Sequence, residues 1–139
     1  MQETTRIVDR EFVTLQYVDE DIILISFPHP IKLDLEAARI VIAGVEEITH
    51  GNAHSAIVDL RNIKSMSRDA RKYFADGTDL TAEVYGNALI TNNSVERLLG
   101  NFFMGLNKPK KFPIRLFDSR KTALKWIKTS VLPTLHIHQ

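Results

Sequence analysis

Apolar residues recur along the chain at two spacings, one typical of strands and the other of helices. Residues 12–17 alternate between apolar and polar, whereas residues 22–27 are almost entirely apolar. The first pattern predicts a half-buried strand and the second a strand covered on both faces. The polar residues 19–21 between them have the length of a turn. Together these segments predict an antiparallel hairpin, which ends at Pro28 and Pro30.

A helical spacing of apolar residues follows between Leu35 and Thr49. Asp34 is placed to cap its first turn, and His50 followed by Gly51 is a typical helix end. Further buried strands are predicted at 56–60, 87–91 and 112–117, the last at an edge of the sheet because it contains Pro113. A further helix is predicted at 68–75, capped by Ser65 or Ser67, and a second short helix is predicted to begin at Asp79. Two more are predicted at 93–106, where Asn93 and Glu96 resemble a capping box, and at 119–129, where Asp118 would be the cap.

Strands that alternate with helices are typical of a parallel sheet with crossover helices. The chain is therefore predicted to be α/β, with a five-stranded, mostly parallel sheet, an N-terminal antiparallel hairpin and about four helices. Its length of 139 residues fits one domain over 1–139.

Composition supports a globular domain and excludes several classes of function. Apolar residues make up 44% of the chain and charged residues 25%, and there is no cysteine, so thiolate chemistry is excluded. No apolar segment is long enough to span a bilayer, and residues 1–10 are too polar for a signal peptide. Cytoplasmic localisation is expected. Residues 1–60 hold four basic and eleven acidic side chains, and residues 61–139 hold fourteen and six. Such a split suggests two opposed faces or self-association, but the preferred interpretation is that the fold interleaves the two halves, so that their charges cancel.

Three passages carry a resemblance to a known family. They are residues 56–63 (Ala-Ile-Val-Asp-Leu-Arg-Asn-Ile), 94–109 (Ser-Val-Glu-Arg-Leu-Leu-Gly-Asn-Phe-Phe-Met-Gly-Leu-Asn-Lys-Pro), and 113–117 leading to 123–127. With the order of elements, they resemble the SpoIIAA-like STAS domains, and most closely the bacterial branch described as STAS/SEC14-like. The resemblance covers nearly the whole chain and implies a STAS architecture.

The resemblance also implies where function would lie. In the best-known STAS domains the loop after the third strand carries an Asp-Ser pair whose serine is phosphorylated by a partner kinase. The matching loop here, residues 63–69, contains Ser65 and Ser67 but no Asp-Ser pair. The related SEC14 fold suggests binding of a lipophilic ligand by analogy.

Candidate catalytic chemistry is sparse. Asp59 is expected near the carboxyl end of a parallel strand, where α/β sheets usually place ligands, either as a structural acceptor for the loop at 61–67 or as an acid or base. The five histidines form no helical pair of metal ligands, and neither a phosphate-binding glycine loop nor a nucleophile elbow is present. No enzyme activity, cofactor or metal is therefore expected.

Residues 102–111 combine apolar and basic side chains. Phe102, Phe103 and Met104 are consecutive, so one helix face cannot bury all three. A wide core, a dimer seam and the wall of an apolar pocket remain open explanations. The lysines that follow, beginning with Lys108, could bind phosphate, nucleic acid or an acidic lipid surface. A solvated loop beside an edge strand is the preferred interpretation.

Three hypotheses follow, in order of preference. The first is a non-enzymatic regulatory module that binds a protein partner or itself as a homodimer, through Ser65, Ser67, Arg68 and the segment from Phe102 to Lys108. The second is a carrier or sensor of a lipophilic small molecule beside Phe102, Phe103 and Met104. The third is an enzyme that uses Asp59 as acid or base.

Overall fold

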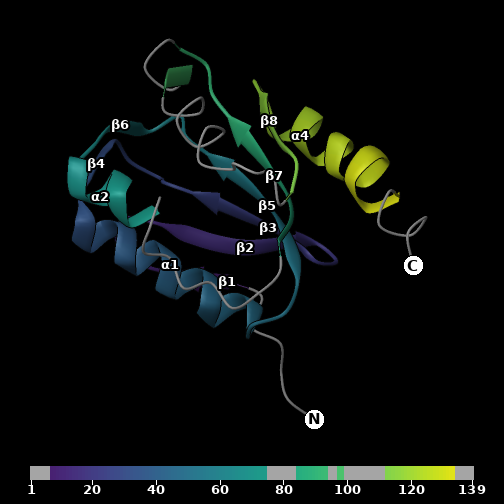
Figure 1. Ribbon diagram of the computed structural model, residues 1–139, viewed down its shortest axis with the longest axis horizontal. Coiled ribbons are helices and arrows are strands. Elements are labelled where there is room, and N and C mark those ends of the chain that lie inside the picture. The colour runs from purple at the N-terminus through teal and green to yellow at the C-terminus, as the bar shows by residue number, and fades with distance from the viewer. Residues whose placement is uncertain (1–6, 75–83, 94–96, 99–111, 134–139) are drawn as a thin grey trace.

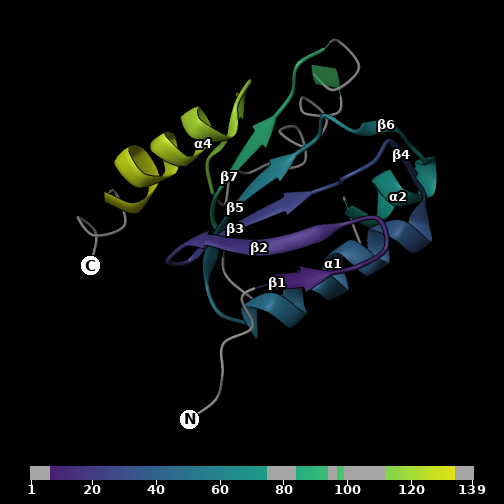
Figure 2. The ribbon, with the colours of Figure 1, turned by 180° about the vertical axis from the view of Figure 1, so that it is seen from behind.

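The computed structural model describes residues 7–74, 84–93, 97–98 and 112–133. A six-stranded sheet in the order β1-β2-β3-β5-β7-β8 forms its centre (Figures 1 and 2). Its strands are β1 (Ile7–Asp9), β2 (Thr14–Asp19), β3 (Ile22–Ser26), β5 (His54–Asp59), β7 (Val84–Ile90) and β8 (Ile114–Phe117). The first three strands pair antiparallel, and β3, β5, β7 and β8 pair parallel. A separate parallel pair joins β4 (Ile31–Leu33) to β6 (Ile63–Met66).

Helices cover the two faces of the sheet at different strands. On one face, α1 (Leu35–Thr49) packs against β1 and β2, with α2 (Arg68–Lys72) beside it. On the other face, α4 (Arg120–Trp126) continues into a π-helical turn, η2 (Ile127–Val131), and both pack on β7 (Figure 1). The sheet therefore has one helix layer under its antiparallel side and another over its parallel side.

The α/β class, the hairpin and the parallel direction of the three later strands are confirmed. The main sheet has six strands instead of the expected five, because the three-residue strand β1 is too short to show an alternating pattern. The short strands β4 and β6 were missed for the same reason. The helices predicted from Asp79 and over 93–106 lie wholly or mostly outside the described residues.

Capping follows the expected chemistry at two helices and differs at the third. The Asp34 side chain accepts a hydrogen bond from the Ala37 amide at 2.9 Å, and His50 ends α1 in the left-handed conformation. Ser67, not Ser65, caps α2. The prediction that Asp118 caps the last helix is wrong: Ser119 has extended backbone, and its hydroxyl accepts from the Thr122 amide at 3.2 Å.

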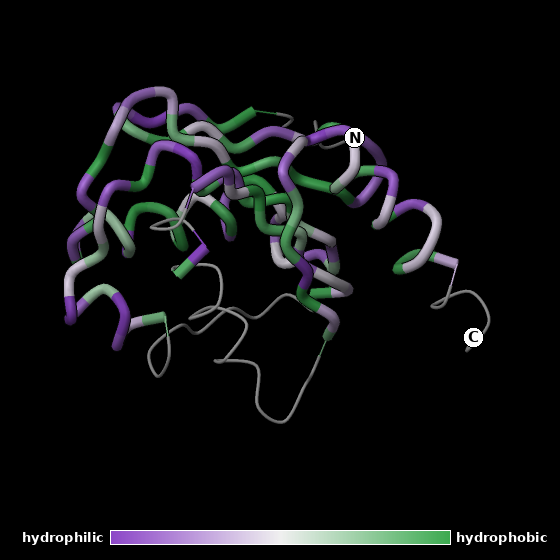
Figure 3. The backbone as a smooth tube through the Cα atoms, turned by 90° about the horizontal axis from the view of Figure 1, so that it is seen from above, coloured by the Kyte–Doolittle hydropathy of each residue, from purple (hydrophilic) through white to green (hydrophobic). Residues whose placement is uncertain are grey.

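Two apolar clusters lie on the two faces of the sheet. The cluster under α1 includes Leu15, Ile23 and Ile48, and the cluster under α4 includes Ile90 and Ile127. Figure 3 shows the green, hydrophobic backbone running through the strands at the centre of the molecule. Successive residues of β3 and β5 alternate between the clusters, which is why these strands read as continuous apolar runs.

Gly44 allows α1 to approach β2 closely. A Cβ atom at this position would lie 2.9 Å from Leu15 Cδ1, a side chain that is itself fully buried. The close contact places α1 over the antiparallel side of the sheet, away from β7 and β8.

Replacing Asp34 with Ala should lower the free energy of unfolding by about 1 kcal/mol, because the Ala37 amide loses its acceptor. Asp34→Asn retains a capping oxygen and should lose only part of this. Urea denaturation of both variants tests the assignment. Equal losses in the two variants would contradict a capping role.

Candidate functional site

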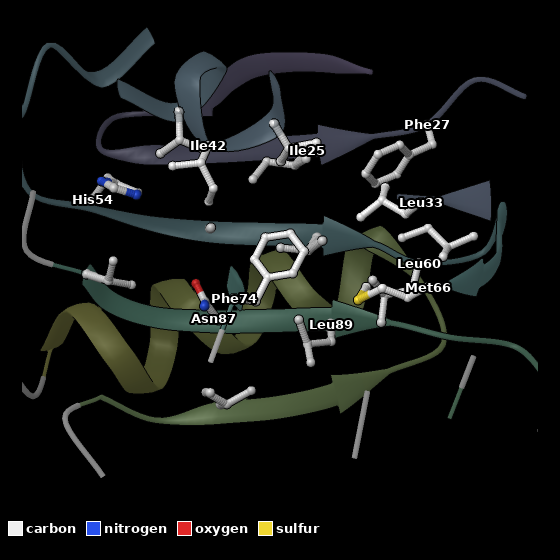
Figure 4. Close-up of a pocket in the computed structure, with 17 residues that line it drawn as sticks. Ile25, Phe27, Leu33, Ile42, His54, Leu60, Met66, Phe74, Asn87 and Leu89 are labelled. Atoms are coloured by element: carbon white, nitrogen blue, oxygen red, sulfur yellow. The ribbon is translucent and has the colours of Figure 1, made fainter. Parts of the chain in front are cut away.

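An apolar cavity lies between α1 and the parallel strands, on the face opposite α4 (Figure 4). Its volume is about 230 Å³. The described residues that line it come from the strands of both sheets and the positions directly after β3 and β5, from α1, and from Phe74 after α2. They are Ile25, Phe27, Leu33, Val41, Ile42, Val45, His54, Ala56, Val58, Leu60, Ile63, Met66, Phe74, Val84, Asn87, Leu89 and Ile114. All but His54 and Asn87 are apolar.

The offset of α1 explains why this cavity exists. Helix α1 packs on β1 and β2. It therefore borders the space over β5 and β7 with only one side, which carries Val41, Ile42 and Val45. Val58 and Ile114 belong to the cavity face of the sheet, yet both are only partly buried. Figure 4 shows Phe74 lying over the middle of the space.

His54 is one of the two polar residues of the lining. It is the first residue of β5 and is 2% exposed. Its Nδ1 lies 3.1 Å from the carbonyl oxygen of Asn52. A carbonyl only accepts, so Nδ1 carries the hydrogen of the neutral ring and Nε2 is left as an acceptor. Burial lowers the pKa of His54 below 6.5, despite opposing effects of the Asn52 carbonyl and of Glu46 and Asp21, so the ring is neutral at pH 7.

Asn87 is the other polar residue. It lies on β7 opposite Ala56, after an irregularity in the pairing between β5 and β7. Its Oδ1 is buried and has no hydrogen-bond partner among the described residues. A buried acceptor without a donor costs free energy, so such groups are rare in native proteins.

Asp59 occupies the opposite, carboxyl end of β5 and faces away from the cavity. Its carboxylate accepts hydrogen bonds from the Arg61 amide (3.1 Å), Arg61 Nε (2.9 Å) and an Arg61 terminal nitrogen (2.7 Å). Arg120 at the start of α4 donates to the same carboxylate at 3.2 and 3.3 Å. Burial alone would raise the pKa of Asp59, but the two arginines hold it below its usual 3.8. The carboxylate is ionised and fully engaged, in agreement with the structural role weighed from sequence.

Three of the residues expected to bind a partner, Ser65, Ser67 and Arg68, lie on one exposed segment. Ser65 is in β6, and Ser67 and Arg68 begin α2; all three are exposed. The Ser67 hydroxyl accepts from the Ala70 amide at 3.0 Å. Met66, between the two serines, points into the cavity lining instead. The segment is separate from Asp59, which faces the two arginines.

Several expectations lie outside the described residues: Phe102, Phe103, Met104 and Lys108, together with the lysines that follow. Within the described residues, no cluster of His, Asp and Glu has the arrangement of a metal site. None of the described helices is both long enough and apolar enough to cross a membrane.

Sequence reasoning missed the two polar residues of the cavity. His54 was weighed only as a metal ligand, and Asn87 only as the start of a buried strand. The sequence did contain a signal for Asn87. A side-chain amide in a strand predicted to be buried on both faces needs a hydrogen-bond partner inside the protein.

Comparison with known proteins identifies a family and a fold. The family model described as "Domain of unknown function (DUF7793)" matches residues 16–131. A solved structure of an uncharacterized protein from the DUF3478 family, with a SpoIIAA-like fold, from Shewanella loihica PV-4 is similar to the chain. The identity is 15%, the TM-score is 0.57, and the alignment covers 91% of this chain and 98% of the other. No curated protein matches. The SpoIIAA-like resemblance of the fold is thereby confirmed.

The buried neutral state of His54 predicts a pH dependence of stability. In the unfolded chain His54 becomes protonated near pH 6.5, whereas in the folded protein its lowered pKa means that protonation requires a lower pH. The free energy of unfolding should therefore fall as the pH drops below about 6.5. In His54→Gln this part of the fall should be absent. Denaturation of both proteins across this range measures it, and parallel stability curves would contradict the assignment.

Proposed function

We propose that this chain, which belongs to the DUF7793 family, is a STAS-like module that binds a small lipophilic molecule without transforming it. The proposed site is the cavity between α1 and the strands β5 and β7. The observation that carries the proposal is a space of about 230 Å³, lined almost entirely by apolar side chains. Binding sites for small molecules are typically apolar hollows with a few polar groups that fix orientation.

The volume limits the size of the ligand. An engineered apolar cavity of about 150 Å³ binds benzene, whereas pockets for drug-sized molecules begin near 300 Å³. A cavity of about 230 Å³ lies between these limits. An apolar molecule somewhat larger than benzene therefore fits this space, whereas a typical drug-sized molecule exceeds it.

A binding role fits the chemistry of the described side chains better than catalysis. Asp59, the acid considered from sequence, is ionised and held by Arg61 and Arg120, so it has neither a proton to donate nor a free lone pair directed at a substrate. His54, in the cavity, is fixed by the Asn52 carbonyl, and the described lining residues include no carboxylate and no hydroxyl nucleophile to pair with it.

A second candidate function adds a protein partner to the first. Met66 lines the cavity, and its neighbours Ser65 and Ser67 are exposed. The Ser67 amide donates to the Leu33 carbonyl at 2.9 Å, and Leu33 also lines the cavity. A ligand that moves Met66 or Leu33 would therefore shift the exposed start of α2. This supports a sensor whose Ser65–Arg68 surface binds a partner or a second copy.

Opposite changes at Val58 test the ligand site. Val58→Phe adds bulk to the cavity and should lower the affinity for naphthalene at least tenfold, because little room for the ligand remains. Val58→Ala enlarges the cavity and should keep binding while costing about 1–2 kcal/mol of stability. Calorimetric titration measures the affinities, and thermal denaturation shows that both variants fold. Equal affinity in the two folded variants would place the ligand elsewhere.

Self-association through the Ser65–Arg68 surface is tested by light scattering. The second candidate predicts a dimer that dissociates in Arg68→Glu, because the exposed charge at the start of α2 is reversed. Lys125→Glu, an equal reversal at an exposed position of α4, is the matched control and should leave the dimer intact. A strict monomer in all three proteins would count against a second copy as the partner.

A further inference from the structure

We propose that a second binding site lies at the carboxyl ends of β7 and β8, and that it takes a small zwitterion, an α-amino acid with an apolar side chain. The site is a hollow of about 320 Å³ beside the point where β8 leads into α4 (Figure 1). The described residues that line it are Thr91, Arg97, Leu116, Phe117, Asp118 and Thr122. None of them lines the apolar cavity, so the two sites are separate and this one does not depend on the proposed function.

The fold forms this hollow from the ends of two neighbouring parallel strands. Thr91 follows β7 directly and Asp118 follows β8 directly, and the Thr91 amide donates to the Phe117 carbonyl at 2.9 Å. Arg97 lies in the segment after β7, where its amide donates to the Asn93 carbonyl at 3.0 Å. The hollow therefore lies at the carboxyl ends of parallel strands, where open α/β sheets usually bind their ligands.

Arg97 and Asp118 bring two opposite charges to the hollow. Both side chains are exposed, so a ligand from solvent can reach them. Neither forms an ion pair or a side-chain hydrogen bond with any described residue, and although both line one hollow they do not pair with each other. Arg120, two residues after Asp118, is already engaged by Asp59. The charges of Arg97 and Asp118 thus remain available to a ligand.

Two opposite charges that line one hollow favour a ligand that carries both. A simple anion is attracted by Arg97 but repelled by Asp118, and the reverse holds for a simple cation. A zwitterion pairs its carboxylate with the guanidinium of Arg97 and its ammonium group with the carboxylate of Asp118. In an α-amino acid a single carbon joins the two charged groups, so the ligand is compact.

Leu116 and Phe117 supply the apolar part of the lining. Both are partly buried, and the Phe117 ring packs against the Trp126 ring with the ring centroids 5.5 Å apart. Thr91 is only 1% exposed, so it closes the wall of the hollow and no hydrogen bond to the ligand is assigned to it. A hollow of about 320 Å³ is near the lower limit of pockets for drug-sized molecules, so an amino acid of the size of leucine fits.

Three probes on one carbon frame test the requirement for both charges: leucine, isocaproate, which lacks the ammonium group, and isoamylamine, which lacks the carboxylate. A heteronuclear NMR titration of the intact protein at neutral pH should show leucine binding about fivefold more tightly than either, because each of the other two loses one ion pair and keeps a like-charge contact. The amide signals that shift should include those of Thr91 and Asp118.

Removing one charge from the site should change the preference among the probes. In Arg97→Gln isoamylamine should bind as tightly as leucine, and in Asp118→Asn isocaproate should do so. Lys125→Gln, an equal loss of charge at an exposed position outside the hollow, is the matched control and should bind leucine as the wild type does. Saturating naphthalene, the probe of the apolar cavity, should not displace leucine.

The outcomes separate this site from the proposed function. Leucine bound with the expected preference, while naphthalene fails to bind, would support this site and refute the apolar ligand. Leucine displaced by naphthalene would place the amino acid in the apolar cavity and overturn this site. Equal affinities of the three probes, no binding of any of them, or a leucine preference that persists in folded Arg97→Gln or Asp118→Asn would also overturn it.

Discussion

The offset between the two helix layers is the constraint on which the rest of the structure depends. The parallel strands β3, β5 and β7 are apolar on both faces, so both faces need cover. On one face α4 and η2 provide it directly, and Ala123, Ile127 and Val131 pack against Ile57, Ala88 and Ile90. On the other face the close approach of Gly44 to Leu15 holds α1 over β1 and β2. The two faces are therefore unequal, and the cavity lies on the face where α1 is displaced.

The polar side chains of β5 also lie in two different surroundings, one at each end of the strand. At the carboxyl end of β5, Asp59 is neutralised by Arg61 and Arg120 and ties the strand to the start of α4. At the amino end, His54 is buried without charge and faces the cavity. The first group stabilises the fold through ionic hydrogen bonds, while the second remains neutral beside an apolar space. The proposed recognition of a lipophilic molecule depends on this neutral, apolar surrounding.

The sequence predicted the fold better than the site, for physical reasons that particular residues illustrate. Periodicity and capping located α1 from Leu35 to Thr49, because the apolar stripe and Asp34 are local signals. The parallel strands were found because β5 and β7 are apolar on both faces. The short strands β1, β4 and β6 were missed because three or four residues carry few positions for a pattern, whereas the four-residue strand β8 was found within the longer segment 112–117. The cavity could not be predicted, because it depends on where α1 crosses the sheet and not on any motif. The usual ligand position at the carboxyl ends of the strands directed attention to Asp59, whereas His54 and Asn87 lie elsewhere on the sheet.

A crystal of the protein pressurised with xenon tests the central claim most directly, because xenon enters dry apolar cavities and is visible in electron density. The account predicts xenon between α1 and the sheet, in contact with Val58 and Leu89, and none between α4 and β7. Side chains of the chain itself filling the space beside Val58 and Leu89, with no xenon bound there, would contradict it.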